Sequence, residues 1–223
     1  MTRHAIESAW LLSFLLSVPG LAAGPSGVDK GRWQWIKDDV ELADYRITRA
    51  DAQSYQAVNR ARGLVASFRG DGVVRPEGAG PGGWEWGVSL AGHGAEGALS
   101  IAENRVEIVR EPLTEWYVNS PEGLVHGFTI SSPPPDRHRG DLVLDLKVTG
   151  TLRPIFVSGG KAVDFFGAGS VSVLRHGALT ATDAMGRNAT ARFEPIPGGV
   201  RIVVDDERAV YPITIESVAT SAG

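Results

Sequence analysis

Two pairs of tryptophans are the side chains of this sequence with the clearest potential for chemistry. Trp33 and Trp35 are separated by one residue, as are Trp84 and Trp86. On a β-strand, residues two apart project from the same face, and an exposed pair of indole rings can stack against a sugar ring. These four tryptophans are therefore the candidate ligand-binding residues. The alternative is that both pairs face inward and form core, which the usual burial of tryptophan favours.

The histidines that follow residue 23 do not form a metal-binding or catalytic motif. His93, His126, His138 and His176 are scattered, with no pair inside one strand or turn, whereas metal ligands usually come at short spacings. We interpret His93 and His138, which lie in segments rich in glycine or proline, as solvated loop residues. No G-x-S-x-G nucleophile motif occurs, and the absence of cysteine excludes disulfides, thiolate metal sites and a cysteine nucleophile. The sequence thus predicts no catalytic residue, no metal site and no cofactor.

The first 23 residues have the order of features that a secretory signal peptide needs. Arg3 precedes an apolar run over residues 10–18, and Pro19-Gly20 is followed by small residues at Ala22 and Ala23. The run is too short to cross a bilayer as a helix. The alternative, a buried N-terminal helix, would end at Pro19-Gly20. We therefore predict that export removes the first 22 or 23 residues and that the protein is secreted or periplasmic.

Composition indicates a single globular domain over residues 24–223. Hydrophobic residues make up 43% of the chain and charged residues 22%, which argues against disorder. The formal net charge of -4 gives no electrostatic reason to expect nucleic acid or an anionic membrane as a partner. No segment after residue 23 has the length of a membrane span, so we expect none.

The distribution of glycine, proline and alternating residues predicts an all-β fold. The 28 glycines and 13 prolines separate short segments in which apolar and polar residues alternate. In residues 141–148 the leucines share one face and the charged residues share the other, as expected of a half-buried strand. Turn residues at 70–72, 103–104 and 120–123 join neighbouring strands into hairpins. We expect an antiparallel β-sandwich of about a dozen short strands, with Pro212 at an edge or a bulge of the last one.

Two segments fall outside this strand pattern. Apolar residues from Trp33 to Ala43 recur at helical spacing, which predicts one short helix over residues 31–43, with an extended arm as the alternative. Residues 131–140 contain three consecutive prolines and could separate two sub-domains. We interpret them instead as a long surface loop within one sandwich, because the residues that follow would bury only a small core by themselves.

Several stretches of the sequence resemble one group of bacterial proteins. These stretches are residues 54–61 (SYQAVNRA), 112–119 (PLTEWYVN) with 123–130 (GLVHGFTI), 174–179 (LRHGAL) with 183–187 (DAMGR), 203–206 (VVDD) and 211–215 (YPITI). Their order is similar to the N-terminal, non-repeat region of large secreted bacterial proteins that continue into FG-GAP repeats, the integrin-alpha-like β-propeller. The resemblance runs from about Tyr45 to Ile215.

What this resemblance implies about function is limited. In these proteins the calcium loops and the ligand surface belong to the propeller, and no catalytic or binding residue of the leading region carries over. This chain has Glu216-Ser217 where an Asp-Pro pair often follows the last strand, and it contains no D-x-D-x-D-G calcium loop. The resemblance therefore implies a truncated or split member, or a free-standing version of the leading domain. Its expected partner is a β-propeller encoded downstream or another envelope protein.

The acidic residues predict that the chain, taken without a propeller, binds no structural calcium. Calcium needs about six to eight oxygen ligands that converge on one point. Asp205 and Asp206 are adjacent and would point to opposite faces of a strand. No second acid lies in the short loop after Asp183.

Two functions remain open from the sequence. The first is a non-catalytic, exported β-sandwich that serves as a structural or interaction module of a cell-envelope or extracellular protein. The second is a carbohydrate-binding module or a small glycan-acting enzyme, which the Trp-x-Trp pairs and the many hairpins suggest. The resemblance and the lack of a reactive motif favour the first.

Overall fold

A computed structural model describes residues 43–69, 74–78, 84–92, 97–134 and 141–222, and of residues 74–78 the backbone alone. All of them belong to one compact unit, Val40–Gly223. The predicted signal peptide (residues 1–23) and, apart from its last residue, the predicted helix at 31–43 lie outside the described residues. The described residues contain sixteen strands and two short 3-10 helices, η1 (Arg60–Arg62) and η2 (Ser158–Gly160).

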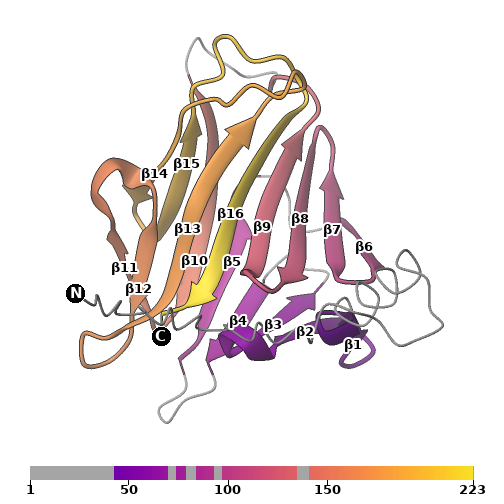
Figure 1. Cartoon of the computed structure of the whole chain (residues 1–223), viewed down its shortest axis with the longest axis vertical. Helices are drawn as coiled ribbons and strands as arrows, with labels where there is room; N and C mark the ends of the chain where they lie inside the picture. The colour runs from indigo at the N-terminus through magenta and orange to yellow at the C-terminus, as the bar shows by residue number, and fades with distance from the viewer. Residues whose placement is uncertain (1–42, 70–73, 79–83, 93–96, 135–140, 223) are drawn as a thin grey trace, which may run out of the picture. The chain divides into compact units, whose positions relative to one another are not determined.

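The strands form two eight-stranded antiparallel sheets, so the predicted all-β class is confirmed (Figure 1). Sheet A contains, in spatial order, β1 (Ile47–Arg49), β2 (Ser54–Asn59), β3 (Leu64–Arg69), β4 (Val74–Gly78), β5 (Trp86–Leu90), β10 (Leu142–Gly150), β15 (Gly199–Val204) and β14 (Ala191–Ile196). Sheet B contains β11 (Arg153–Phe156), β12 (Val163–Phe166), β13 (Ser172–Thr182), β16 (Ile213–Ser221), β9 (Gly123–Ile130), β8 (Leu113–Ser120), β7 (Arg105–Arg110) and β6 (Ala98–Ala102).

Strands from both halves of the chain share each sheet. In sheet A, β10 pairs with β5, which precedes it across residues 131–140. In sheet B, β16 pairs with β9 in the same way. The described residues on either side of 131–140 therefore build the same two sheets, and neither half has a sheet of its own.

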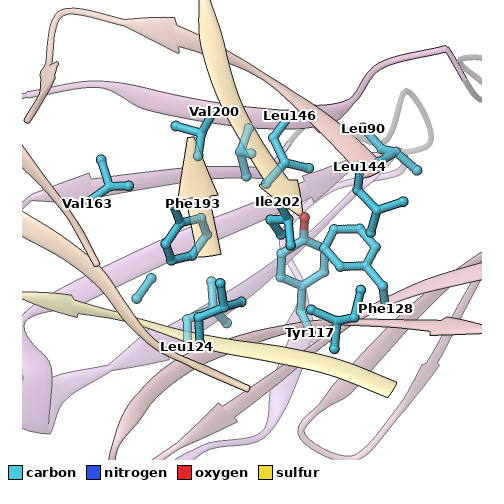
Figure 2. Packing of buried hydrophobic residues seen from close by; sticks show 14 of the residues in the cluster. Leu90, Tyr117, Leu124, Phe128, Leu144, Leu146, Val163, Phe193, Val200 and Ile202 are labelled. Atoms are coloured by element: carbon cyan, nitrogen blue, oxygen red, sulfur yellow. The ribbon is translucent and has the colours of Figure 1, made fainter. Parts of the chain in front are cut away.

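The inward-facing residues of both sheets meet in one hydrophobic core (Figure 2). Leu142, Leu144 and Leu146 of β10 are buried, which confirms the alternation predicted for residues 141–148. Leu144 and Leu146 belong to the same core cluster as Tyr117 and Phe128 of sheet B. Strands of both sheets contribute buried residues to this core, and polar residues at inward positions are therefore enclosed between the sheets.

Three predicted hairpins are confirmed by antiparallel pairing of the flanking strands. They are β3 with β4, β6 with β7, and β8 with β9. The prediction for Pro212 was wrong, because β16 begins one residue later, at Ile213, and lies inside sheet B between β13 and β9. Proline has no amide hydrogen to donate, so the hydrogen-bonded ladder starts after it. No helix in the described part of the chain is long and apolar enough to cross a membrane.

Candidate functional site

The structure describes two of the four candidate ligand-binding tryptophans. Trp86 in β5 is 3% exposed, and its ring meets Phe165 of sheet B edge-on with the centroids 5.1 Å apart. Trp84 lies just before β5, is partly buried and packs against the core. The interpretation of the pair as core is therefore confirmed for Trp86, whose ring offers no open face to a sugar. Trp33 and Trp35 lie outside the described residues.

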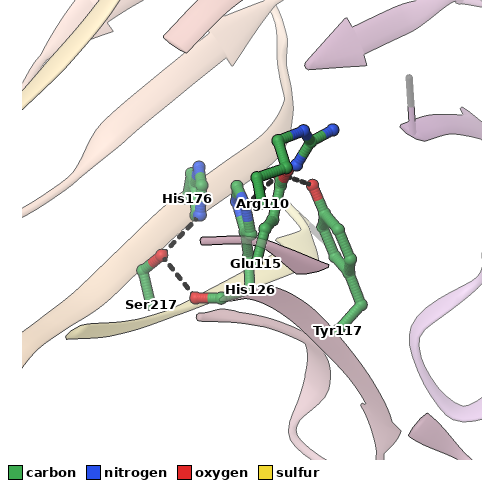
Figure 3. Close-up of polar contacts among 6 residues, drawn as sticks. All are labelled: Arg110, Glu115, Tyr117, His126, His176 and Ser217. Carbon is green, nitrogen blue, oxygen red and sulfur yellow. Dashed lines mark hydrogen bonds and ion pairs between the residues drawn. The ribbon is translucent and has the colours of Figure 1, made fainter. Parts of the chain in front are cut away.

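The fold brings together a different set of reactive side chains, inside the core. This set, the core polar cluster, comprises Arg110, Glu115, Tyr117, His126, His176 and Ser217 (Figure 3). Its members come from β7, β8, β9, β16 and β13, which are consecutive neighbours in sheet B. Each member is at most 9% exposed. The cluster is thus enclosed between the sheets.

Strand alternation explains why these polar residues point inward. His126 is in phase with Leu124 and Phe128 of β9, which are both buried. The strand register places Ser217 opposite His126, and His126 opposite Tyr117. A row of polar side chains therefore crosses the inner face of sheet B from strand to strand.

Glu115 is the negative centre of the cluster and is fully buried. Its Oε2 accepts a hydrogen bond from Arg110 Nη1 at 2.7 Å. Its Oε1 accepts from the Tyr117 hydroxyl at 2.6 Å and from His126 Nε2 at 3.0 Å. Burial opposes ionisation, but the hydrogen bonds from His126 and Tyr117 and the positive charge of Arg110, with that of a protonated His126, outweigh it and leave the pKa of Glu115 below its ordinary value. The carboxylate and the Arg110 guanidinium thus form a compensated buried pair.

The rings of the cluster are stacked. The His126 ring lies 4.4 Å from the Tyr117 ring at an interplanar angle of 11°, and 5.7 Å from the His176 ring at 15°. Burial, together with the neighbouring Glu115, raises the pKa of Tyr117 well above its ordinary value. Burial, together with the charge of a protonated His126, lowers the pKa of His176 to about 3. Tyr117 and His176 are therefore both neutral at neutral pH.

Ser217 connects the two histidines. Its Oγ lies 2.7 Å from His176 Nε2 and 3.3 Å from the backbone carbonyl oxygen of His126. One hydroxyl hydrogen satisfies both contacts when His176 Nε2–H donates to Ser217 and Ser217 donates to the carbonyl. In this arrangement His176 is the donor and not a base toward the hydroxyl, so Ser217 is not an activated nucleophile.

Three buried polar atoms among the described residues lack a hydrogen-bond partner. They are Trp86 Nε1, Arg110 Nε and His126 Nδ1. Trp86 contacts the cluster directly, because its ring meets the His176 ring edge-on at 6.0 Å. Unpaired buried polar atoms are costly, so the neighbourhood of the two histidines is the least well satisfied part of the interior.

A second polar arrangement lies at the turn between β13 and β14. Asp183 Oδ1 accepts from the backbone N–H groups of Met185 and Arg187, at 2.9 Å each. Its Oδ2 accepts from Arg187 Nη2 at 2.6 Å and from the Val210 N–H at 3.1 Å. The hydrogen bonds from the Arg187 side chain, with those from the backbone, hold the pKa of Asp183 well below its ordinary value. The carboxylate thus fastens this turn to the loop before β16.

Two hollows in the surface differ in character. The first, of about 380 Å³, adjoins Asp183 and is mainly polar, with Arg187, Asn188, Thr190, Asp205, Glu207 and Arg208 in its lining. The second, of about 410 Å³, is mainly apolar, with Leu152, Pro154, Phe156, Pro195 and Ile196 in its lining. Neither is lined by a member of the core polar cluster. Within the described ranges, no group of three or more acidic, histidine or cysteine side chains could hold a metal ion.

Sequence reasoning missed the core polar cluster. It treated His126 and His176 as scattered residues, although both lie in apolar strand segments. His126 is two residues from Leu124 and two from Phe128, and this spacing predicts that it faces inward with them. The contact between the two histidines could not be predicted from the sequence, because β9 and β13 are brought together by β16, a later strand.

No protein-family model matches this chain, and neither a curated protein nor a solved structure matches it significantly. The resemblance to the leading region of FG-GAP proteins therefore stays a prediction.

Proposed function

We propose that this chain is a non-catalytic, exported β-sandwich domain that serves as a structural or interaction module of a cell-envelope or extracellular protein of the FG-GAP type. The observation that carries the non-catalytic part is the burial of the core polar cluster, whose members are at most 9% exposed. Side chains enclosed in this way cannot touch a substrate in the folded protein. Their hydrogen bonds are directed to one another, as in a structural network.

Export is supported by the sequence of residues 1–23, and the use of residues 24–223 as one mature domain follows from it. An exported chain without cysteine depends on burial and hydrogen bonding for its stability. The large shared core and the buried polar cluster supply both. The expected location is the periplasm or the medium, and the expected partner is a β-propeller encoded downstream or another envelope protein.

A carbohydrate-binding module, or a small glycan-acting enzyme, is the second candidate. The observation that favours it is Trp84, which is only partly buried. Glycan binding by the purified protein that Trp84→Ala abolishes would favour this candidate. Binding that Trp84→Ala leaves unchanged would mean that the glycan contacts another part of the protein.

Labelling with a fluorophosphonate, a reagent for activated serine hydroxyls, tests the proposal. Ser217 lies close to His176, so it is the described serine that most resembles a nucleophile beside a base. We expect no labelling of the folded protein and no hydrolysis of a panel of ester and glycoside substrates. Labelling that Ser217→Ala abolishes, or turnover that His176→Gln abolishes, would overturn the proposal.

A further inference from the structure

The stacked pair of His126 and His176 lies where the core has no negative charge left to balance an added positive one. The cluster holds one guanidinium, Arg110, and one carboxylate, Glu115, joined at 2.7 Å with side chains 5% and 0% exposed. These two charges compensate each other. A proton taken up by either imidazole therefore adds a net positive charge between the sheets.

His176 is the ring with the less favourable surroundings for a charge. From sheet A it is faced by Trp86 of β5 at 6.0 Å and Phe193 of β14 at 5.5 Å, and neither of these can ionise in the relevant range. From sheet B it is faced by Ser217 of β16 and His126 of β9. Glu115, the carboxylate of the cluster, contacts His126 and not His176. Among the described residues that contact His176, the one titratable group is thus another histidine.

His126 also has titratable and charged groups around it. Glu115 of β8 accepts from its Nε2, and Tyr117 of β8 stacks on its ring. Arg110 of β7 pairs with the other oxygen of the same carboxylate. His176, which belongs to β13, lies on the opposite side of the His126 ring from Tyr117. Among the described residues, a protonated His126 has one carboxylate in reach, whereas a protonated His176 has none and faces His126 at 5.7 Å.

We propose that the His126–His176 pair is an acid-sensitive switch, in which protonation of His176 releases the contact between the two sheets at Trp86 and Phe193. While His176 is neutral, it donates to Ser217 and packs between aromatic rings of the opposite sheet. Without a carboxylate in reach, a charged His176 ring is stable only where water can reach it, so acid favours a state in which β5 and β14 have separated from β13. The switch requires neither export nor a partner.

The direction of the effect follows from linkage. An exposed histidine has a pKa near about 6.5, whereas enclosure lowers the pKa of His176 to about 3 in the closed protein. The open state therefore binds more protons between these two values. The stabilisation by neutral His176 is fully present above about pH 6.5 and is lost progressively as the pH falls toward about 3. Between about pH 7 and about pH 5, the equilibrium constant for opening should rise by about 25-fold.

Denaturant unfolding of the purified protein at about pH 7 and about pH 5 tests the switch. In this range the carboxylates with lowered pKa values, such as Glu115 and Asp183, still keep their charges. We expect the unfolding constant of the wild type to rise by about 25-fold. His176→Gln keeps an N–H donor for Ser217 but cannot take up a proton, so most of the rise should disappear. Hydrogen exchange in β5 and β13, corrected for its intrinsic pH dependence, should accelerate in the wild type and not in this variant.

Ser217→Ala is the matched control, since it removes a hydrogen bond of His176 but leaves the ring titratable. It should be less stable at both pH values and keep the rise. A wild-type unfolding constant that does not change between about pH 7 and about pH 5 overturns the proposal, as does an equal rise in His176→Gln. Because that variant could fail to fold, the imidazole resonances of the wild type provide a second measurement. A native His176 that titrates near about pH 6.5 would contradict the switch.

Discussion

Asn59 of β2 and Asn119 of β8 join the two sheets through a buried hydrogen bond, in which Asn59 Nδ2 donates to Asn119 Oδ1 at 2.9 Å. Asn119 Nδ2 donates in turn to the carbonyl oxygens of Tyr45 and Val58 at 3.0 and 3.2 Å. Asn59 Oδ1 accepts from the Arg62 N–H at 3.1 Å. Both amides are at most 2% exposed. The sheets are therefore held by specific polar contacts at this end as well as by hydrophobic packing.

Asn119→Ala should lower the free energy of unfolding by about 2–4 kcal/mol, because it leaves buried polar partners of Asn119 unsatisfied. Denaturant titration measures this loss. Asn104→Ala is the control, since Asn104 is half-buried and donates one side-chain hydrogen bond, to the Asn119 carbonyl. It should cost about 1 kcal/mol or less. Equal losses in the two variants would contradict the role given to Asn119.

Gly127→Ala should be strongly destabilising, although it adds a single methyl group. A Cβ at this position would lie 2.2 Å from the Trp116 ring. That ring is held by a hydrogen bond from its Nε1 to Thr129 Oγ1 at 3.1 Å and by the Arg105 guanidinium at 4.2 Å from its centroid. We expect a loss of about 3 kcal/mol from overpacking, measured by denaturant unfolding.

Gly167→Ala provides the comparison for Gly127. At Gly167 the nearest atom to an added Cβ would be 3.6 Å away, which is ordinary contact. Its stability should stay within about 0.5 kcal/mol of the wild type. A tolerated alanine at 127 would mean that the Trp116 ring can move, contrary to its contacts.

The sequence predicted the strands of this fold better than their arrangement. The alternation in residues 141–148 and the turns at 103–104 and 120–123 are local signals, and the structure confirms them. The pairing of β10 with β5 and of β16 with β9 depends on distant segments, which a local pattern does not specify. The core polar cluster depends on the same long-range pairing. The sequence could therefore predict that its residues face inward, but not that they are neighbours.

Trp86→Ala should lower the free energy of unfolding by about 3–5 kcal/mol, because it removes a buried ring that packs on Phe165 and His176. Thermal and denaturant unfolding both report this change. Trp84→Ala should cost less, since Trp84 is only partly buried. A Trp86 variant as stable as the wild type would show that this ring is not part of the core and would strengthen the carbohydrate hypothesis.

Asp183→Asn should lower the melting temperature at neutral pH and flatten its decline in acid. The pKa of Asp183 is depressed in the folded protein, first by the hydrogen bonds from Arg187. Its stabilisation is therefore present above the ordinary carboxyl pKa of about 4 and is lost as the pH falls below that value. Melting temperatures between about pH 6 and about pH 2 give the profile. Asp205→Asn, at an exposed residue beside the same hollow, is the control and should leave the melting temperature at neutral pH near the wild-type value, because Asp205 accepts a long hydrogen bond from the Glu207 N–H, at 3.3 Å.

On our proposal, the histidines of the core polar cluster are enclosed in the folded protein and serve its structure. Diethyl pyrocarbonate modifies accessible neutral imidazoles, and peptide mass mapping locates the modified residues. At about pH 7, where histidine is mostly neutral, His126 and His176 should remain unmodified in the native protein and become modified after unfolding in denaturant. Modification of either residue in the native protein, at the rate of a free histidine, would contradict the enclosure and with it the proposed non-catalytic role.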